Sequence, residues 1–219
     1  MAESASLESF LDKWRARWPE WGVLLVFVPR GQRVAAAAWY CLLQELADAA
    51  WGGGDPTPGL AKLAWWQEEL RGWARGARRH PLGDALQKQQ APWEALGRAL
   101  TVLPATRSPE SAEGDVDALR AFAVQLLACE AAMFGGRGPD DHVVVDVVAG
   151  LRAERSLVQG DPGMATGLRP GLRPCAPSRP RRLQQVVVRE RLRLMEGGGP
   201  SARPASLRML LAGWRAARG

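Results

Sequence analysis

Apolar residues recur at helical spacing along most of the chain, and turn-forming residues separate the segments that carry them. The clearest segment has apolar residues at intervals of three and four, namely Leu63, Trp66, Leu70, Trp73 and Ala77. Such spacing is typical of one buried helix face. Pro58 stands where the first turn would begin, a position at which its missing N–H costs little. The pattern predicts an amphipathic helix that ends between Gly76 and Pro81.

The same reasoning predicts further helices over 7–18, 31–51, 82–90, 92–103, 117–134, 182–195 and 205–218. Residues 142–155 are rich in valine and would suit a strand by propensity, but we expect a helix because no partner strand is evident. The Pro-, Gly- and Ser-rich segments 104–116 and 160–181 are predicted to be surface loops. The sequence therefore predicts one all-α domain over 1–219, with about eight helices.

The predicted helix over 31–51 carries two different faces. One face has small residues and then two acids, in the order Val34, Ala37, Ala38, Cys41, Glu45 and Asp48. The other has large apolar residues such as Trp39 and Leu42, which indicates core. Carboxylates three residues apart lie on one side of a helix and could share a hard cation such as Mg²⁺. The pattern favours a cavity wall with a metal at Glu45 and Asp48; a solvated acidic face is the alternative.

Positive charge is concentrated near the end of the chain. The formal net charge is +6, and residues 150–219 hold 14 arginines against 4 acids. Such a region could meet phosphate, an anionic membrane surface or nucleic acid, although a solvated basic face explains it equally well. Nucleic-acid binding is not expected, because no recognition-helix, zinc or aromatic-plus-glycine motif accompanies the charge.

The sequence lacks the residues that several other kinds of catalytic or metal site require. The chain has 3 cysteines at spacings that fit no metal motif and 2 histidines, which excludes a His-rich metal site and a Ser-His-Asp triad. The first residues lack the basic and apolar regions of a signal peptide, and the longest apolar runs are too short to cross a bilayer. We expect a cytoplasmic protein, with peripheral contact at the inner membrane as an alternative.

Two stretches of the chain resemble a known family. Phe27, Pro29 and Arg33 fit the pattern F-x-P-x-x-x-R, and Tyr40 continues it toward an acidic run that reads Gln44-Glu45-Leu46-Ala47-Asp48. Residues 62–70 read K-L-A-W-W-Q-E-E-L, with H-P-L-G at 80–83, and we expect Trp66 and Trp73 to pack inward while Glu68 and Glu69 are solvated. In these blocks the chain resembles the squalene/phytoene synthases, which are head-to-head prenyl transferases.

Two later blocks resemble the family less closely. In 121–134 Phe122 stands where family members have Tyr, and both glycines of that block are replaced. In 146–157 Leu151 and Arg152 match, but Ala149 and Ala153 replace the family's Asn and Asp. Prenyl transferases neutralise a leaving diphosphate with several Mg²⁺ ions held by acids on two facing helices. Losing one acidic cluster should remove at least one ion and lower the rate strongly.

The resemblance implies an isoprenoid-synthase-like helical bundle around a central cavity. It implies substrate contacts at Arg30, Arg33, Tyr40, Phe122 and Arg152, where guanidinium groups suit phosphate, and Mg²⁺ at Glu45 and Asp48. The implied function is binding of prenyl diphosphate, with prenyl transfer in isoprenoid biosynthesis at reduced activity. The alternative is a non-catalytic binding or assembly module that keeps the fold, as do complex I assembly factors with this domain. The partner would be a prenyl diphosphate, another apolar small molecule or a protein.

Overall fold

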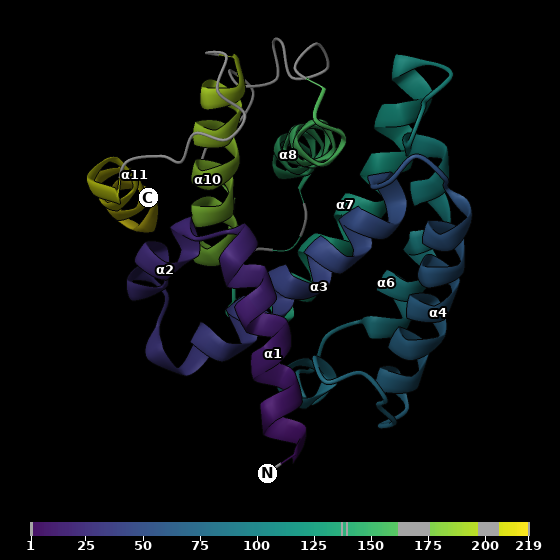
Figure 1. The fold of residues 1–219 in the computed structure, drawn as a ribbon, viewed down its shortest axis with the longest axis horizontal. Coiled ribbons are helices and arrows are strands. Elements are labelled where there is room, and N and C mark those ends of the chain that lie inside the picture. The colour runs from purple at the N-terminus through teal and green to yellow at the C-terminus, as the bar shows by residue number, and fades with distance from the viewer. Residues whose placement is uncertain (1, 137, 139, 162–175, 197–205, 219) are drawn as a thin grey trace.

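The computed structural model describes residues 2–136, 138, 140–161, 176–196 and 206–218, and all regular structure in these ranges is helical. This confirms the predicted all-α class. Figure 1 shows the arrangement of the elements. In chain order they are α1 (Ala2–Arg17), α2 (Glu20–Leu24), η1 (Leu25–Phe27), η2 (Arg30–Gln32), α3 (Arg33–Trp51), α4 (Thr57–Ala74), α5 (Gly83–Leu86), α6 (Trp93–Ala99), η3 (Leu100–Thr106), α7 (Ala112–Phe134), α8 (Asp141–Gln159), α10 (Arg179–Glu196) and α11 (Ser206–Arg218).

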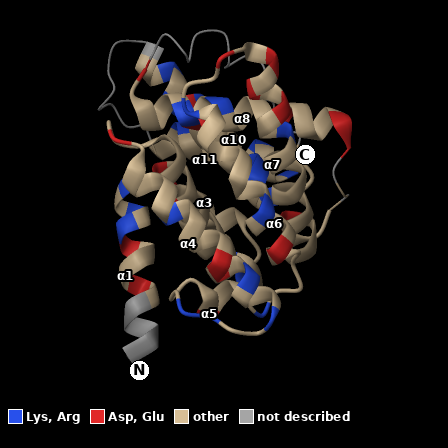
Figure 2. Ribbon diagram, turned by 90° about the vertical axis from the view of Figure 1, so that its right-hand side faces the viewer, with Lys and Arg blue, Asp and Glu red and all other residues tan. Residues whose placement is uncertain are grey.

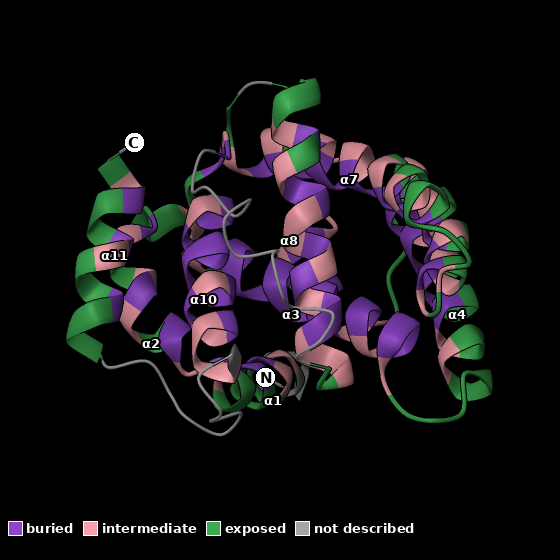
Figure 3. Cartoon of the chain, turned by 90° about the horizontal axis from the view of Figure 1, so that it is seen from above, coloured by how far each residue is buried: buried purple, intermediate pink, exposed green. Residues whose placement is uncertain are grey.

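Helix α3 is the most enclosed element of the fold. It packs against α1, α4, α5, α8 and η3, and its middle is buried all round (Figure 3). Residues 117–134 are apolar nearly all round, which predicts a central buried helix, yet α7 keeps an exposed stripe through Glu113, Asp117 and Ala121. The run Ala35–Ala38 explains the difference, because small side chains let helices approach α3 from several sides.

A glycine sets the crossing of α3 and α4. A Cβ atom on Gly59 would lie 2.1 Å from the carbonyl oxygen of Ala49, which is far inside van der Waals contact. The first turn of α4 therefore rests directly on the backbone of α3. This close approach brings Lys62 of α4 beside Glu45 of α3.

Tryptophans fill much of the core, and most of their buried indole N–H groups are hydrogen-bonded there, although that of Trp66 has no partner. Trp39, Trp73 and Trp93 form a chain of ring contacts with centroid separations of 6.3 and 5.2 Å. A buried polar group costs free energy unless it is hydrogen-bonded, and six buried indoles find acceptors. The pairs are Trp18–Gln44, Trp21–Gln184, Trp39–Glu130, Trp51–Thr106, Trp73–Glu69 and Trp93 with the carbonyl of Gln89.

The valine-rich segment is a helix, as predicted. Helix α8 begins after Asp140, whose side chain accepts a hydrogen bond from the N–H of Val143, and it ends at Gly160 in the left-handed conformation with φ 68°. Capping at both ends, together with burial of Val144 and Val147, outweighs the strand propensity of valine.

The predicted loops are shorter than expected. In place of a loop over 104–116, η3 continues to Thr106 and α7 begins at Ala112, because Ser111 caps it by accepting a hydrogen bond from the N–H of Gly114. At the other loop, α10 already begins at Arg179, and residues 162–175 lie outside the described part of the chain. The helix predicted over 82–90 shrinks to the single turn of α5.

Along the described side chains of α1, acids lie toward the N-terminal end and bases toward the C-terminal end (Figure 2), and Arg15 pairs with Glu8 and Asp12. Across the described ranges, no helix combines the length and the apolar character that crossing a bilayer requires.

Candidate functional site

The two predicted metal ligands lie together on α3, and each is paired with a cation. The Lys62 ammonium is 2.6 Å from Oε2 of Glu45. Asp48 Oδ1 is 3.2 Å from the guanidinium of Arg17 and accepts a hydrogen bond of 2.8 Å from Gln44. Both carboxylates are partly exposed, with 26% and 36% of their side-chain surface accessible. The acids of α3 thus join α3 to α1 and α4.

This environment does not fit a magnesium ion. Mg²⁺ requires near-octahedral oxygen ligands, and the charges of both carboxylates are already balanced by Lys62 and Arg17. Among the residues that the structure describes, no group of three or more His, Cys, Asp or Glu side chains could hold a metal. Burial raises the pKa of Asp48, against the opposing effects of Arg17 and the Gln44 hydrogen bond.

The three predicted phosphate-binding arginines do not converge. Arg30 is exposed in η2. Arg33 donates from Nε and Nη2 to the carbonyl oxygens of Val28 and Val26, at 3.0 and 3.1 Å. Arg33 is also the first residue of α3, so at 1.5 Å per residue it lies about 18 Å along the helix from Glu45. One diphosphate could not contact both.

Arg152 belongs to a different buried cluster on α8. Its Nε is 3.3 Å from Oδ2 of Asp115, the carboxylate that Arg155 holds with two hydrogen bonds of 2.5 and 2.9 Å. Arg155 also donates to the carbonyl of Thr106 at 2.5 Å. The cluster ties α8 to the first turn of α7 and to η3, which is a structural role.

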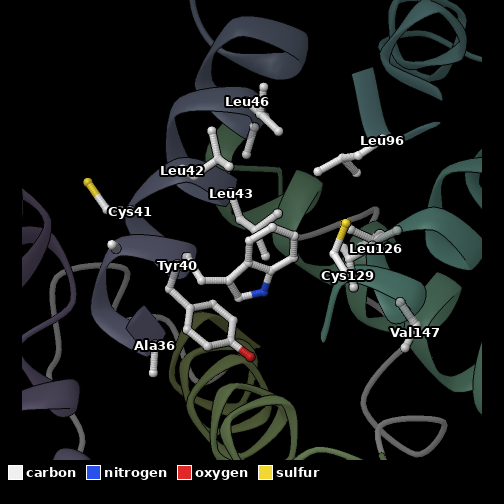
Figure 4. Packing of buried hydrophobic residues seen from close by; sticks show 14 of the residues in the cluster. Ala36, Tyr40, Cys41, Leu42, Leu43, Leu46, Leu96, Leu126, Cys129 and Val147 are labelled. Carbon is white, nitrogen blue, oxygen red and sulfur yellow. The ribbon is translucent and has the colours of Figure 1, made fainter. Parts of the chain in front are cut away.

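Tyr40 and Phe122 are both core residues, 2% and 3% exposed. Figure 4 shows Tyr40 pointing from α3 toward α10, while Cys41 points the opposite way. The Tyr40 ring lies against Trp21, at a centroid distance of 4.8 Å, and its hydroxyl has no hydrogen-bond partner. Of the seven residues predicted for the site, only Glu45 and Asp48 share one surface.

The sequence pattern did not single out a second, deeply buried charged pair. Glu130 of α7 is 1% exposed and Arg181 of α10 is 4% exposed, and the two form an ion pair in which Arg181 Nε donates to Glu130 Oε1 at 3.0 Å. The same carboxylate accepts hydrogen bonds from Trp39 and Ser178, at 2.8 and 3.1 Å. A lone acid within the apolar run over 121–134 was the only sign of it in the sequence.

A second carboxylate lies near this pair. Glu154 of α8 accepts a hydrogen bond of 2.8 Å from Gln184, whose amide oxygen accepts one of 2.9 Å from Trp21. The Arg181 guanidinium stands over the Tyr40 ring at 5.4 Å. We name Tyr40, Glu130, Glu154, Arg181 and Gln184 the interior polar cluster. It joins α3, α7, α8 and α10.

Electrostatics within the interior polar cluster keep the Tyr40 phenol protonated and Arg181 charged. Burial raises the pKa of the Tyr40 phenol well above its usual value, although Arg181 partly offsets this. Burial also raises the pKa of Glu154, again against Arg181. Burial alone would lower the pKa of Arg181, but Glu130 and its hydrogen bonds raise it. A protonated phenol and a permanently charged arginine suit a role in holding helices together.

The two described cysteines are not activated nucleophiles. Burial raises the pKa of the Cys41 thiol to about 12, and it raises the pKa of Cys129 as well. A thiol attacks only as the thiolate, so both remain protonated near neutral pH. The third cysteine, Cys175, lies outside the described residues.

The segment 62–83 forms a compact structural unit. Trp66 and Trp73 are buried and Glu68 is exposed, as predicted, but Glu69 is only 1% exposed. Glu69 accepts hydrogen bonds from Trp73 Nε1 and from the backbone N–H groups of Arg79 and His80, at 2.7 to 2.8 Å. Although burial would raise the pKa of Glu69, these hydrogen bonds lower it.

A cavity of about 490 Å³ opens at the C-terminal end of α3, away from the Glu45–Asp48 surface. Apolar residues dominate its wall, including Ala49, Ala50, Leu60 and Pro104. Arg107 stands at its edge and donates to the carbonyl oxygens of Ala50, Gly52 and Gly53, so it caps the helix. The resemblance had implied a cavity at the acidic face of the helix.

Comparisons with family models, with curated proteins and with solved structures yield no match for this chain. The resemblance to the squalene/phytoene synthases therefore rests on the motifs quoted above.

Proposed function

We propose that this protein is a helical binding module with a squalene/phytoene synthase-like layout, and that it works without metal-assisted prenyl transfer. The observation that carries the proposal is the pairing of Glu45 with Lys62 and of Asp48 with Arg17. An acid whose charge is balanced by a neighbouring cation attracts a divalent ion much less strongly than a free carboxylate.

Helix α8, which packs against α3, supports the same proposal. A prenyl transferase needs acids on two helices, because several cations must neutralise the departing diphosphate. On α8 the positions aligned with two of the family's polar residues are Ala149 and Ala153. The neighbouring acid, Glu154, is held by Gln184 within the interior polar cluster. Neither helix thus offers a carboxylate without a partner.

A second candidate function is binding of an apolar small molecule, and the cavity beside Ala49 and Leu60 favours it. Pockets of about 300–1,000 Å³ with mostly apolar walls and a few polar groups are the usual binding sites for small ligands. This cavity has that size and composition, with Ser108 and Asp115 among its polar residues. Asp115, however, already holds Arg155.

The test of the proposal is an incubation of the protein with farnesyl or geranylgeranyl diphosphate and Mg²⁺, with released pyrophosphate and extracted products both measured. The matched control is Glu45→Gln/Asp48→Asn, which removes both charges from α3. We expect wild type and variant to release pyrophosphate at the same background rate. Mg²⁺-dependent release with a condensed hydrocarbon, present only in the wild type, would show that the protein is a transferase.

Melting curves separate the two candidates. A ligand that binds only the folded state raises the melting temperature. A rise with geranylgeraniol, which lacks the diphosphate, would favour the apolar-ligand function, and Ala49→Leu should abolish that rise by filling the cavity. No rise with either the alcohol or the diphosphate would favour a module that binds a macromolecule.

A further inference from the structure

Helix α11 turns large apolar residues toward solvent. Leu207 is 70% exposed, Leu211 50%, Trp214 48% and Leu210 38%. These positions follow the spacing i, i+3, i+4 and i+7, so they form one stripe along the helix. We name these four residues the outer stripe. In Figures 1 and 3 α11 lies at the edge of the molecule, with its outer side exposed.

The opposite face of α11 is small and firmly docked. Met209, Gly213 and Ala216 are buried. A Cβ atom on Gly213 would lie 2.4 Å from Leu24 Cδ2 of α2, so the helix rests closely on its neighbour. Arg182 of α10 also donates a hydrogen bond of 2.7 Å to the carbonyl of Ala216. The helix is held in an orientation that leaves the outer stripe uncovered.

The charged side chains of α11 itself are all basic. Helix α11 contains no acidic residue; Arg215 and Arg218 are exposed, and the guanidinium of Arg218 lies 4.6 Å from the centre of the Trp214 ring. Arg208 pairs with Glu190 of α10, at 2.6 Å. Leucines and a tryptophan flanked by arginines are the composition of helices that lie flat in the headgroup region of a bilayer.

Charge identifies the kind of surface that would cover the stripe. A second copy that used the same face in a two-fold dimer would bring arginine against arginine, which is repulsive. Anionic lipid headgroups would instead attract these arginines, while the leucines enter the acyl boundary. We propose that the outer stripe of α11 is a peripheral docking surface for an anionic lipid bilayer. This inference does not rest on the proposed function, because vesicle binding and pyrophosphate release are separate readouts.

The test is cosedimentation of the full chain with phosphatidylcholine vesicles that either contain or lack phosphatidylglycerol. The wild type should bind the phosphatidylglycerol vesicles much more strongly, and added salt should weaken binding. Leu207→Gln/Leu211→Gln should weaken binding about tenfold or more. Val145→Gln is the matched control, because Val145 is 52% exposed on α8, and it should bind like the wild type.

A second variant tests the charge. Arg215→Gln/Arg218→Gln should weaken binding by about fivefold for each arginine removed, whereas Arg98→Gln on α6 should not. All these side chains are exposed, so the variants should keep the wild-type circular dichroism spectrum. The proposal fails if the wild type does not bind, if it binds both kinds of vesicle equally, or if the leucine variant binds as well as Val145→Gln. It also fails if light scattering shows that the leucine variant dissociates a wild-type dimer.

Discussion

Removing one charge of the buried Glu130–Arg181 pair should destabilise the protein severely. Glu130→Gln keeps one oxygen, which can accept from Trp39 at the Oε1 position, and its NH2 group can donate to the Ser178 hydroxyl that now donates to Oε2. The main change is therefore the lost charge. The Arg181 guanidinium, 4% exposed, would then lack its closest counter-ion. Breaking a buried ion pair from one side costs about 3–5 kcal/mol. Glu154 compensates in part, because its charge also acts on Arg181, so we expect the lower end of that range.

For a chain of this size, a loss of about 3 kcal/mol should lower the melting temperature by roughly 6–12 °C. Urea unfolding followed by circular dichroism measures the free energy directly. Arg181→Met should cost a similar amount, since it leaves the Glu130 carboxylate buried. The double variant Glu130→Gln/Arg181→Met should cost less than the two single changes together, with a coupling energy of about 2–3 kcal/mol.

The exposed pair Glu94–Arg98 on α6 serves as the matched control. Its side chains are 47% and 65% exposed, and removing either charge should cost at most about 0.5 kcal/mol. The reasoning is refuted if Glu130→Gln costs no more than the control, or if the effects of the two buried changes are simply additive.

Two further predictions concern the backbone and pH. Gly59→Ala should destabilise the protein by about 2 kcal/mol or more, because its Cβ would collide with the carbonyl oxygen of Ala49. The control Gly22→Ala places its Cβ where no atom is near, so it should be neutral or slightly stabilising. Equal urea midpoints for the two variants would contradict this prediction. Burial lowers the pKa of His80, and the hydrogen bonds from Arg79 and His80 lower that of Glu69 despite its burial. The free energy of unfolding should therefore fall as the pH drops below about 6.5, because the histidine of the unfolded chain takes up a proton before His80 of the folded protein does. It should fall again below about 4.5, where Glu69 of the unfolded chain takes up a proton before Glu69 of the folded protein. Glu69→Gln should flatten the second step, and a urea midpoint that stays constant or rises on acidification would refute the assignment.

Local patterns predicted most of the helices, because apolar spacing and end signals act within a few residues. The valine-rich α8 and the amphipathic α4 are examples. Contacts between residues far apart in the sequence could not be predicted from such local patterns. Glu69 looked solvated, and it is buried only because the chain reverses at Gly76, with φ 86°, and returns the N–H groups of Arg79 and His80 to it.

In the candidate site, too, local features could be predicted from the sequence and long-range contacts could not. The placement of Glu45 and Asp48 on one face of α3 followed from their spacing. Their pairing with Lys62 and Arg17 depends on how α4 and α1 cross α3, which no local pattern encodes. The Glu130–Arg181 pair joins residues 51 positions apart, so only the assembled fold brings them together.

Binding of a divalent ion to the acids of α3 is the most direct test of the central claim, that Lys62 and Arg17 already balance these charges. Mn²⁺ can replace Mg²⁺, and electron paramagnetic resonance reports the free ion. With farnesyl diphosphate present, titration of the wild type and of Glu45→Gln/Asp48→Asn should leave the same free Mn²⁺ signal. A signal that falls further with the wild type than with the variant would contradict the account.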